Sequence, residues 1–165
     1  MRGEVELDDS LDPDVGLRAP SQRRELIGQH GPVLGVIALG GGFGALARYG
    51  LAQALPALPG QFPWATFVTN VLGCLLIGVL MVLITEVWTA HRLVRPFLGV
   101  GILGGFTTFS TYAVETRGLL RPGTVPLAFA YWAGTLLAAL CAVVAGVWVT
   151  RAAVRRTGHR REKAV

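Results

Sequence analysis

The chain has 165 residues, of which 52% are hydrophobic and only 15% are charged. An average soluble domain carries about 25% charged residues, and the charges here gather at the two ends and in brief clusters with long neutral stretches between them. This pattern argues against a soluble domain and indicates a protein that folds in a bilayer. In that setting the 22 glycines predict helices that pack closely through small residues.

The first 31 residues are polar. They begin with a run of acidic side chains and turn basic at Arg18, Arg23 and Arg24. No apolar run of the signal-peptide type precedes Gly31, so we do not interpret the segment as a cleaved targeting sequence. We predict a disordered cytoplasmic extension over residues 1–31.

The first two predicted spans cover residues 32–55 and 64–85, with a proline- and glycine-rich loop between them. Pro32 suits the first turn of a helix, and Gly40, Gly44 and Arg48 share one face of the first span. The second span has no formally charged residue, and Trp64 fits an aromatic anchor at the membrane interface.

The third predicted span, residues 96–114, contains adjacent glycines followed by a polar run, Gly104-Gly105-Phe106-Thr107-Thr108-Phe109-Ser110-Thr111-Tyr112. Irregular backbone survives at membrane depth only where it is buried in protein or lines a wet cavity. A helix broken at Gly104-Gly105 would free carbonyl oxygens, which hard cations bind. The alternative, of about equal weight, is a glycine-rich packing face whose hydroxyls bond back to the preceding turn.

The fourth predicted span, residues 123–150, contains no charge and exceeds the roughly 20 residues that cross a bilayer. A basic tail, residues 151–165, follows it. Four spans place both termini on one side, where 12 of the 15 Lys and Arg residues fall, against two on the other side and Arg48 within a span. The positive-inside rule therefore predicts that both termini are cytoplasmic.

Several intramembrane polar and aromatic side chains are candidates for an ion path. Phe109 and Tyr112 share a helix face, and the positive edge of an aromatic ring can favour a small anion; two core aromatics are the commoner alternative. Asn70 lies in mid-span, where a buried amide must face protein or a polar path, or joins two helices. Tyr131 and Thr135 are one turn apart and could extend a hydroxyl-lined track, although packing alone would also explain them.

Arg48 is the only Arg or Lys inside a span, which is costly unless it faces a wet cavity or snorkels to the interface. Arg48 could set an electropositive vestibule at the end of the pore. Glu115 is a second candidate vestibule residue, for which solvation at the end of the span is the alternative. Cys74 and Cys141 lie in apolar stretches and the three histidines are far apart, so neither a disulfide framework nor a zinc cluster is expected. No catalytic constellation indicates an enzyme, and we expect no nucleic-acid partner.

Three of these segments together resemble the CrcB/Fluc family of fluoride channels. The run from Gly104 to Tyr112, followed by Glu115, resembles the third-helix signature of that family. The segment GGGFGALARY at residues 40–49 resembles its first-helix motif, and Thr66-x3-Asn70-x2-Gly73 its second. The resemblance covers roughly residues 33–150 in the family's order.

The resemblance implies an all-α membrane protein whose four-helix subunits form an antiparallel dimer with two fluoride pores. It implies a third helix broken near its middle, and a structural Na⁺ held at the dimer interface by backbone carbonyls of Gly104 and Thr107. Phe109 matches the first pore phenylalanine, and Tyr112 stands where the second is usually Phe. The remaining implied pore residues are Asn70, Ser110 and Thr111, with Tyr131 and Thr135 on the weakly marked fourth helix.

We therefore expect a fluoride-selective channel, with residues 32–150 as the channel domain in the cell membrane, that exports F⁻ passively and lowers cytoplasmic fluoride. The 12-to-two charge bias favours one orientation, so we hypothesise a heterodimer with a paralogue of opposite bias. The alternative function is a small multidrug-type proton-coupled exporter, which needs a membrane-embedded carboxylate that the first span lacks. A non-transporting membrane assembly factor is a third possibility.

Overall fold

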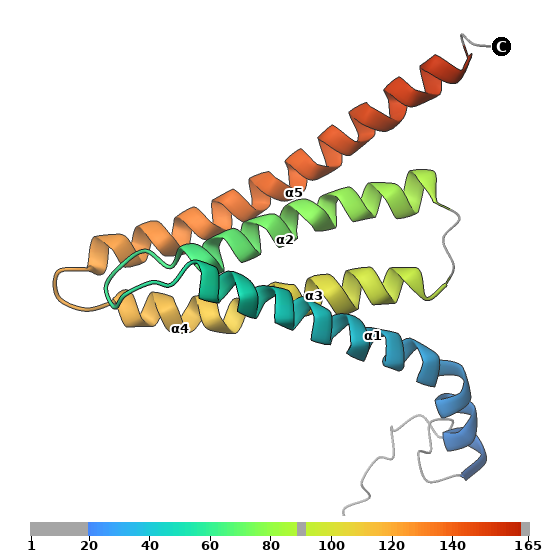
Figure 1. Ribbon diagram of the computed structural model, residues 1–165, viewed down its shortest axis with the longest axis horizontal. Coiled ribbons are helices and arrows are strands. Elements are labelled where there is room, and N and C mark those ends of the chain that lie inside the picture. Colours follow the sequence, from blue (N-terminus) through green and yellow to red (C-terminus); the bar gives the residue numbers. More distant parts are fainter. Residues whose placement is uncertain (1–19, 89–91, 163–165) are drawn as a thin grey trace, which may run out of the picture.

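The computed structural model describes residues 20–88 and 92–162, and within them side chains over 30–88 and 92–156. In this described part the regular elements are all helical, in the order α1 (Pro20–Ala54), α2 (Trp64–Val82), η1 (Leu83–Val87), η2 (Pro96–Leu103), α3 (Gly104–Phe106), α4 (Phe109–Leu119) and α5 (Val125–Glu162) (Figure 1). The elements η1 and η2 are π-helical, and η1 continues α2 without interruption.

Four of the described helical segments are long and apolar enough to cross a membrane, which confirms the four predicted spans. They are His30–Ala54, Trp64–Val87, Pro96–Leu119 and Val125–Arg156. Two helices extend past the predicted spans: α1 begins at Pro20 rather than near Pro32, and α5 continues to Glu162 rather than ending near Thr150. The disorder predicted for the N-terminal extension stays a prediction for residues 1–19, which lie outside the described residues, and the division into three regions also stays a prediction.

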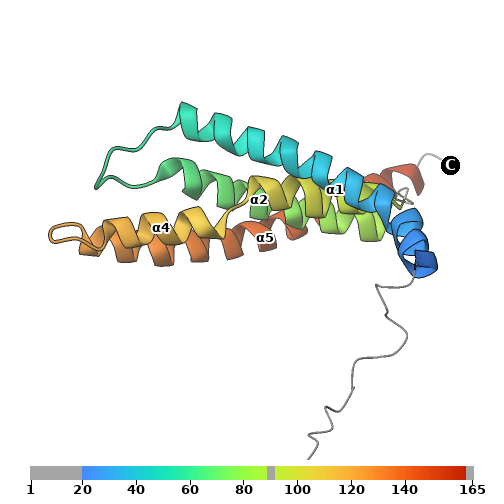
Figure 2. The same ribbon diagram turned by 90° about the horizontal axis from the view of Figure 1, so that it is seen from below.

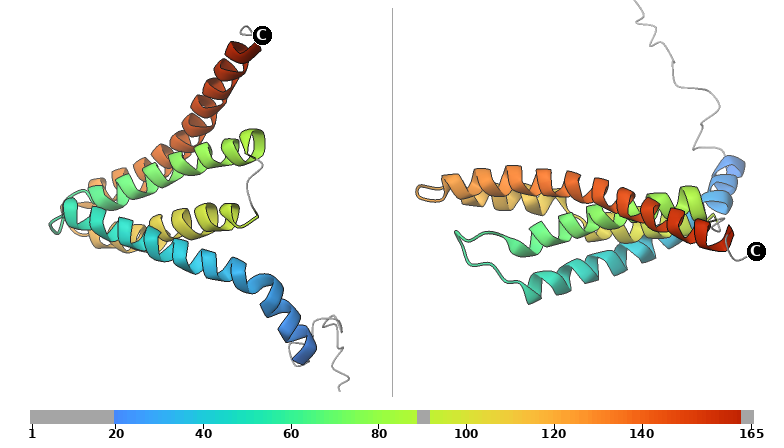
Figure 3. Two further views of the ribbon diagram at one scale, coloured as in Figure 1. Left: turned by 45° about the vertical axis from the view of Figure 1, so that its right-hand side comes forward. Right: turned by 90° about the horizontal axis from the view of Figure 1, so that it is seen from above.

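The helices form two packed groups. α2 packs along α5, while α1 packs along η2 and α3. The groups converge at the end that carries the loops around Gly60 and Gly123, and they splay apart toward the opposite end, as Figure 1 and the left view of Figure 3 show. The polar candidates of α2, α4 and α5 lie where the helices converge.

Glycines allow the helix backbones within both packed groups to approach each other closely. A Cβ added at Gly44 would lie 2.1 Å from the Ile102 carbonyl oxygen, and one at Gly40 would lie 2.6 Å from that of Phe97. On the other pair, a Cβ at Gly78 would lie 2.4 Å from the Val143 carbonyl oxygen. Such distances are too short for any side chain, so the helix backbones touch directly, as the glycine content predicts.

The third span is broken, as predicted, but not at the predicted residues. Gly104 and Gly105 remain helical in α3, and the extended backbone lies at Thr107 (φ −75°, ψ 156°) and Thr108 (φ −148°, ψ 122°) (Figure 2). Gly105 has a packing role instead, because a Cβ there would lie 2.3 Å from the Gly41 carbonyl oxygen. The break falls where side chains can take over the lost backbone hydrogen bonds.

A small buried core lies at the converging end, made by Tyr112, Leu119, Ala128 and Tyr131. Phe62, Phe67 and Leu127 pack around it, half-buried. Many large apolar side chains of the isolated chain are exposed, including Leu39, Phe43 and Leu46 on α1 and Phe109 on α4. Lipid or another chain must cover these surfaces in a membrane.

Candidate functional site

The side chain of Asn70 on α2 holds both backbone groups of Thr108 at the break. Its Nδ2 donates to the Thr108 carbonyl oxygen at 2.9 Å, and its Oδ1 accepts from the Thr108 N–H at 2.9 Å. Backbone groups at membrane depth must be paired, and here one amide side chain pairs a donor and an acceptor together. Of the two roles considered for Asn70, this contact favours that of joining two helices.

Hydroxyl groups gather on the first turn of α4. The Thr108 Oγ1 accepts from the Thr111 N–H at 3.2 Å, which caps the helix, and donates to Thr111 Oγ1 at 3.0 Å. Ser110 Oγ lies 3.3 Å from the same Thr108 oxygen. Thr108 was not among the predicted site residues. A threonine directly before a helical segment is an N-cap signal, and this signal could have identified Thr108.

Glu115 lies one turn further along α4 and accepts two hydroxyl hydrogen bonds. Thr66 on α2 donates to Oε1 at 3.0 Å, and Tyr131 on α5 donates to Oε2 at 2.7 Å. Both donors are buried, Tyr131 completely. Glu115 is therefore tied into three helices rather than simply solvated at the end of a span.

The predicted aromatic pair occupies two different environments. Phe109 is 81% exposed in the isolated chain, whereas Tyr112 is 7% exposed and donates its hydroxyl to the Trp132 carbonyl oxygen. The two ring centroids are 5.8 Å apart, and that of Tyr112 is 5.3 Å from Tyr131. Tyr112 is thus part of the core, and Phe109 is free to meet an ion or a second chain.

Arg48 reaches from α1 to the broken span, where its Nε donates to the Gly105 carbonyl oxygen at 3.2 Å. It also lines a cavity of about 190 Å³ between α1, α2 and α4. The polar residues that line this cavity are Arg48, Thr66, Thr69, Thr108, Thr111 and Glu115. The structure therefore brings both predicted vestibule residues, Arg48 and Glu115, to one polar cavity, which gives Arg48 a wet or polar environment in place of lipid.

A wider recess of about 470 Å³ opens beside this cavity at the loop end, and the two share Ala57, Pro63 and Glu115. Arg121 lines the recess. The recess at the loop end therefore adjoins the cavity that lies beside the break in the third span.

Thr135 on α5 is the remaining predicted pore residue. Its side chain is buried, and its Oγ1 is, among the described side chains, the one buried polar atom without a hydrogen-bond partner. A buried hydroxyl without a partner is costly, so this position has the chemistry to receive a water molecule or an anion.

The predicted Na⁺ site rests on backbone oxygens, and the residues at the break fit such a site. The described residues contain no cluster of three His, Cys, Asp or Glu side chains that could hold a metal ion. Gly104 is exposed, and a Cβ there would meet nothing within 4 Å, so its peptide can be approached from outside the chain. Thr107 lies in the extended link. Oxygen donors of this kind suit a hard cation.

Comparison with known proteins decides the family. A family model described as "CrcB-like protein, Camphor Resistance (CrcB)" matches residues 35–147. The chain belongs to the CrcB family. This CrcB-family chain is similar to "Fluoride-specific ion channel FluC 2" of Nocardia farcinica, at 60% identity over 127 residues that cover 74% of the chain and 91% of the relative.

Two Streptomyces relatives carry related names. "Fluoride-specific ion channel FluC 1" of Streptomyces coelicolor is 54% identical over 136 residues, covering 82% of this chain and 88% of the relative. "Fluoride-specific ion channel FluC 3" of Streptomyces avermitilis is 44% identical over 124 residues, covering 75% of this chain and 61% of the relative. The family resemblance seen in the three sequence motifs is therefore confirmed.

Proposed function

We propose that this CrcB-family protein is a fluoride-selective channel, not an enzyme, that lets F⁻ leave the cell passively across the cell membrane. The observation that carries the proposal is the interrupted third span, where hydroxyl groups and an arginine gather at membrane depth around a polar cavity. The names of the relatives support fluoride as the ion.

The polar side chains can replace part of the water that a small anion loses. The hydroxyls of Ser110 and Thr111 offer partial positive charge without a fixed countercharge, so the ion can bind and still leave. Thr108 donates to Thr111 Oγ1 and therefore leaves the Thr111 proton available. Arg48 raises the local potential for an anion at the cavity. The Glu115 carboxylate is engaged by two donors, which reduces its repulsion toward a passing anion.

A second copy or a paralogue would complete the site. Phe109 and Gly104 are both exposed in the isolated chain, so a second chain can reach the edge of the Phe109 ring and the backbone beside the break. We propose an antiparallel dimer in which the carbonyls of Gly104 and Thr107 from both chains hold a structural Na⁺. The bound cation would neutralise the carbonyl dipoles that face one another across the interface.

The test is fluoride efflux from liposomes that contain the purified protein, followed with a fluoride electrode and compared with chloride. We expect fast fluoride release with negligible chloride release. Equal passage of both ions would contradict the selectivity, and no passage of either, even with a partner chain present, would contradict the channel function.

The charge distribution bears on the identity of the second chain. The charge bias favours one orientation with both termini cytoplasmic, and one organism, Streptomyces avermitilis, has relatives named FluC 2 and FluC 3. We propose a heterodimer with a paralogue of opposite bias. Robust fluoride efflux from liposomes that contain this chain alone would contradict it, whereas efflux only after co-reconstitution would support it.

The alternative, a small multidrug-type exporter, has less support. Its chemistry needs a membrane-embedded carboxylate that exchanges protons for a cation. In the described spans Glu86 pairs with Arg151 and Glu115 is held by two hydroxyls, while the first span carries Arg48. The names of the relatives also favour the fluoride channel.

A further inference from the structure

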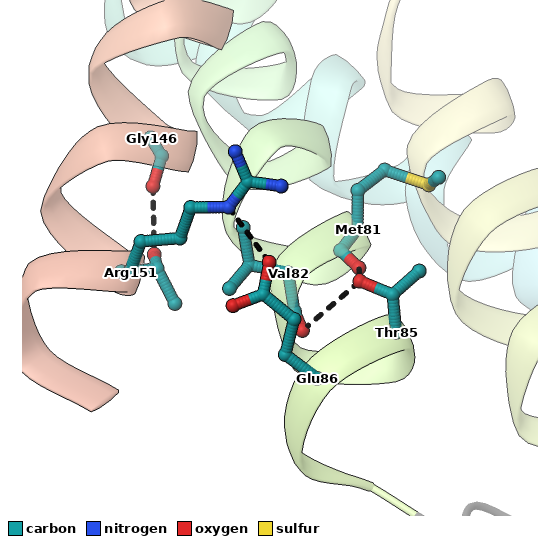
Figure 4. A network of polar contacts seen from close by, with 7 residues as sticks. Met81, Val82, Thr85, Glu86, Gly146 and Arg151 are labelled. Carbon is teal, nitrogen blue, oxygen red and sulfur yellow. Dashed lines mark hydrogen bonds and ion pairs between the residues drawn. The ribbon is translucent and has the colours of Figure 1, made fainter. Parts of the chain in front are cut away.

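The fourth span continues as a helix beyond the end of its neighbour. Glu86, in the last turn before Val87, pairs with Arg151 on α5 at 2.7 Å (Figure 4), which places these two residues at one level. From Arg151 the helix runs on to Glu162, about 16 Å further at 1.5 Å per residue. In Figure 1 this end of α5 projects past α2 without a neighbouring helix.

This end of the molecule is strongly basic. Arginines on α5 and on the loop between the second and third spans form a group that we name the basic collar: Arg92, Arg95, Arg151, Arg155 and Arg156. All five are exposed. Glu86 is the only described acidic side chain at this end, and it is already paired with Arg151. Among the described side chains, the basic residues at the opposite end are Arg117 and Arg121.

The collar lies at the level where the spans leave the membrane. The second span ends at Val87 and the third begins at Pro96, and on the fourth helix Arg151 stands level with Glu86 through their ion pair. Trp148 is 72% exposed and lies about one turn before Arg151, as an aromatic anchor in the headgroup region would. Arg95 donates to the Ile84 carbonyl oxygen at 2.8 Å, which holds its guanidinium beside the end of the second span.

We propose that the basic collar binds the headgroups of anionic phospholipids. Guanidinium groups match phosphate oxygens in a two-point geometry, and each basic residue near an anionic membrane surface strengthens binding about five-fold. The collar follows the membrane boundary across three spans rather than forming a concave pocket for a soluble ligand. Arg155 and Arg156 form no ion pair within the described part of the chain, and they stand beyond the paired Arg151.

Quenching of tryptophan fluorescence by brominated lipids can test this assignment. The full chain would first be given Trp64→Phe and Trp132→Phe, so that the remaining tryptophans, Trp88 and Trp148, report on the collar end. The protein is then placed in mixed micelles with brominated phosphatidylglycerol or brominated phosphatidylcholine. We expect the anionic lipid to quench at a clearly lower mole fraction than the zwitterionic lipid.

Two double variants distinguish lipid binding at the basic collar from an effect of the net charge of the protein. Arg155→Gln with Arg156→Gln should weaken the preference for phosphatidylglycerol by roughly 25-fold, at about five-fold for each arginine. Arg117→Gln with Arg121→Gln removes the same charge from the opposite end and should leave the preference unchanged. Circular dichroism checks that both variants keep their helical content.

Three results would overturn the proposal. The first is equal quenching by both lipids in the parent protein, and the second is an unchanged preference in the Arg155/Arg156 variant. The third is release of the anionic lipid by about 20 mM inorganic phosphate but not by sodium chloride at the same ionic strength, which would identify a free-anion site rather than screening. None of these readouts depends on fluoride transport.

Discussion

At the residue scale, the Asn70 side chain holds the Thr108 backbone in position at the break in the third span. Its amide gives the Thr108 backbone one donor and one acceptor, which a helix would otherwise supply. A carboxylate in the same place keeps the acceptor but sets a second oxygen against the Thr108 carbonyl. Replacing the amide by a carboxylate therefore leaves the Thr108 carbonyl oxygen without its donor and places two oxygens against each other at the break.

Asn70→Asp is expected to abolish fluoride efflux and to destabilise the fold by about 1–3 kcal/mol, the usual cost of a buried polar group left unpaired. Efflux from liposomes and thermal unfolding in detergent measure the two effects. Gln53→Glu is the matched control, because Gln53 is an exposed amide whose side chain bonds only locally to Tyr49. Normal efflux in Asn70→Asp would show that the amide does not control the path.

Phe109 and Tyr112 should separate function from stability. Phe109→Ala is expected to reduce fluoride efflux strongly with little change in the stability of the single chain, because the ring is 81% exposed. Tyr112→Phe keeps the ring but removes the hydroxyl that bonds to Trp132, so it should cost about 0.5–1.5 kcal/mol and leave efflux largely intact. Reversed results would place the ion path at Tyr112.

At the element scale, the close approach of α1 to the broken span rests on glycine. Gly44→Ala would set a Cβ 2.1 Å from the Ile102 carbonyl oxygen, and relief requires the backbones to separate, which typically costs about 1–3 kcal/mol. Gly35→Ala lies on the same helix with nothing within 4 Å and should be neutral or slightly stabilising. Thermal unfolding of both variants checks the difference.

The sequence predicts the four membrane spans more accurately than it predicts the position of the break in the third span. Long uncharged stretches predict the four spans because the bilayer requires them, and the charge distribution follows from the same constraint. The position of the break is less visible, since two adjacent glycines look like the weak point. Gly105 is needed for contact with Gly41, while the break depends on Asn70, a residue far away in the chain.

The candidate site shows the same limit. Arg48 and Glu115 are visible in the sequence as charges near spans, and the structure brings them to one cavity. The hydrogen bonds of Glu115 to Thr66 and Tyr131 join residues from three helices, and no local pattern encodes such contacts. The burial of Tyr112 beside an exposed Phe109 likewise depends on how α4 rotates against α5, which spacing alone does not determine.

At the scale of the whole molecule, the uneven distribution of positive charge predicts a single orientation. Leu58→Lys with Gln61→Lys adds two charges to an exposed loop at the weakly charged end, and Arg155→Gln with Arg156→Gln removes two at the other. The combined variant is expected to insert partly in the reverse orientation. Protease accessibility of a C-terminal tag in sealed vesicles measures the fraction, and a fraction unchanged from the parent would contradict charge as the cause.

The buried hydroxyl of Thr135 has a consequence for engineering. Since its oxygen has no partner within the described side chains, the isolated fold would gain from an isosteric methyl group at this position, by an amount on the order of 1 kcal/mol. Thr135→Val should thus raise the melting temperature. If the hydroxyl donates a hydrogen bond to an ion in the pore, the substitution should also slow fluoride release. A thermostabilised form of this protein selected on melting temperature alone would then be a poorer conductor.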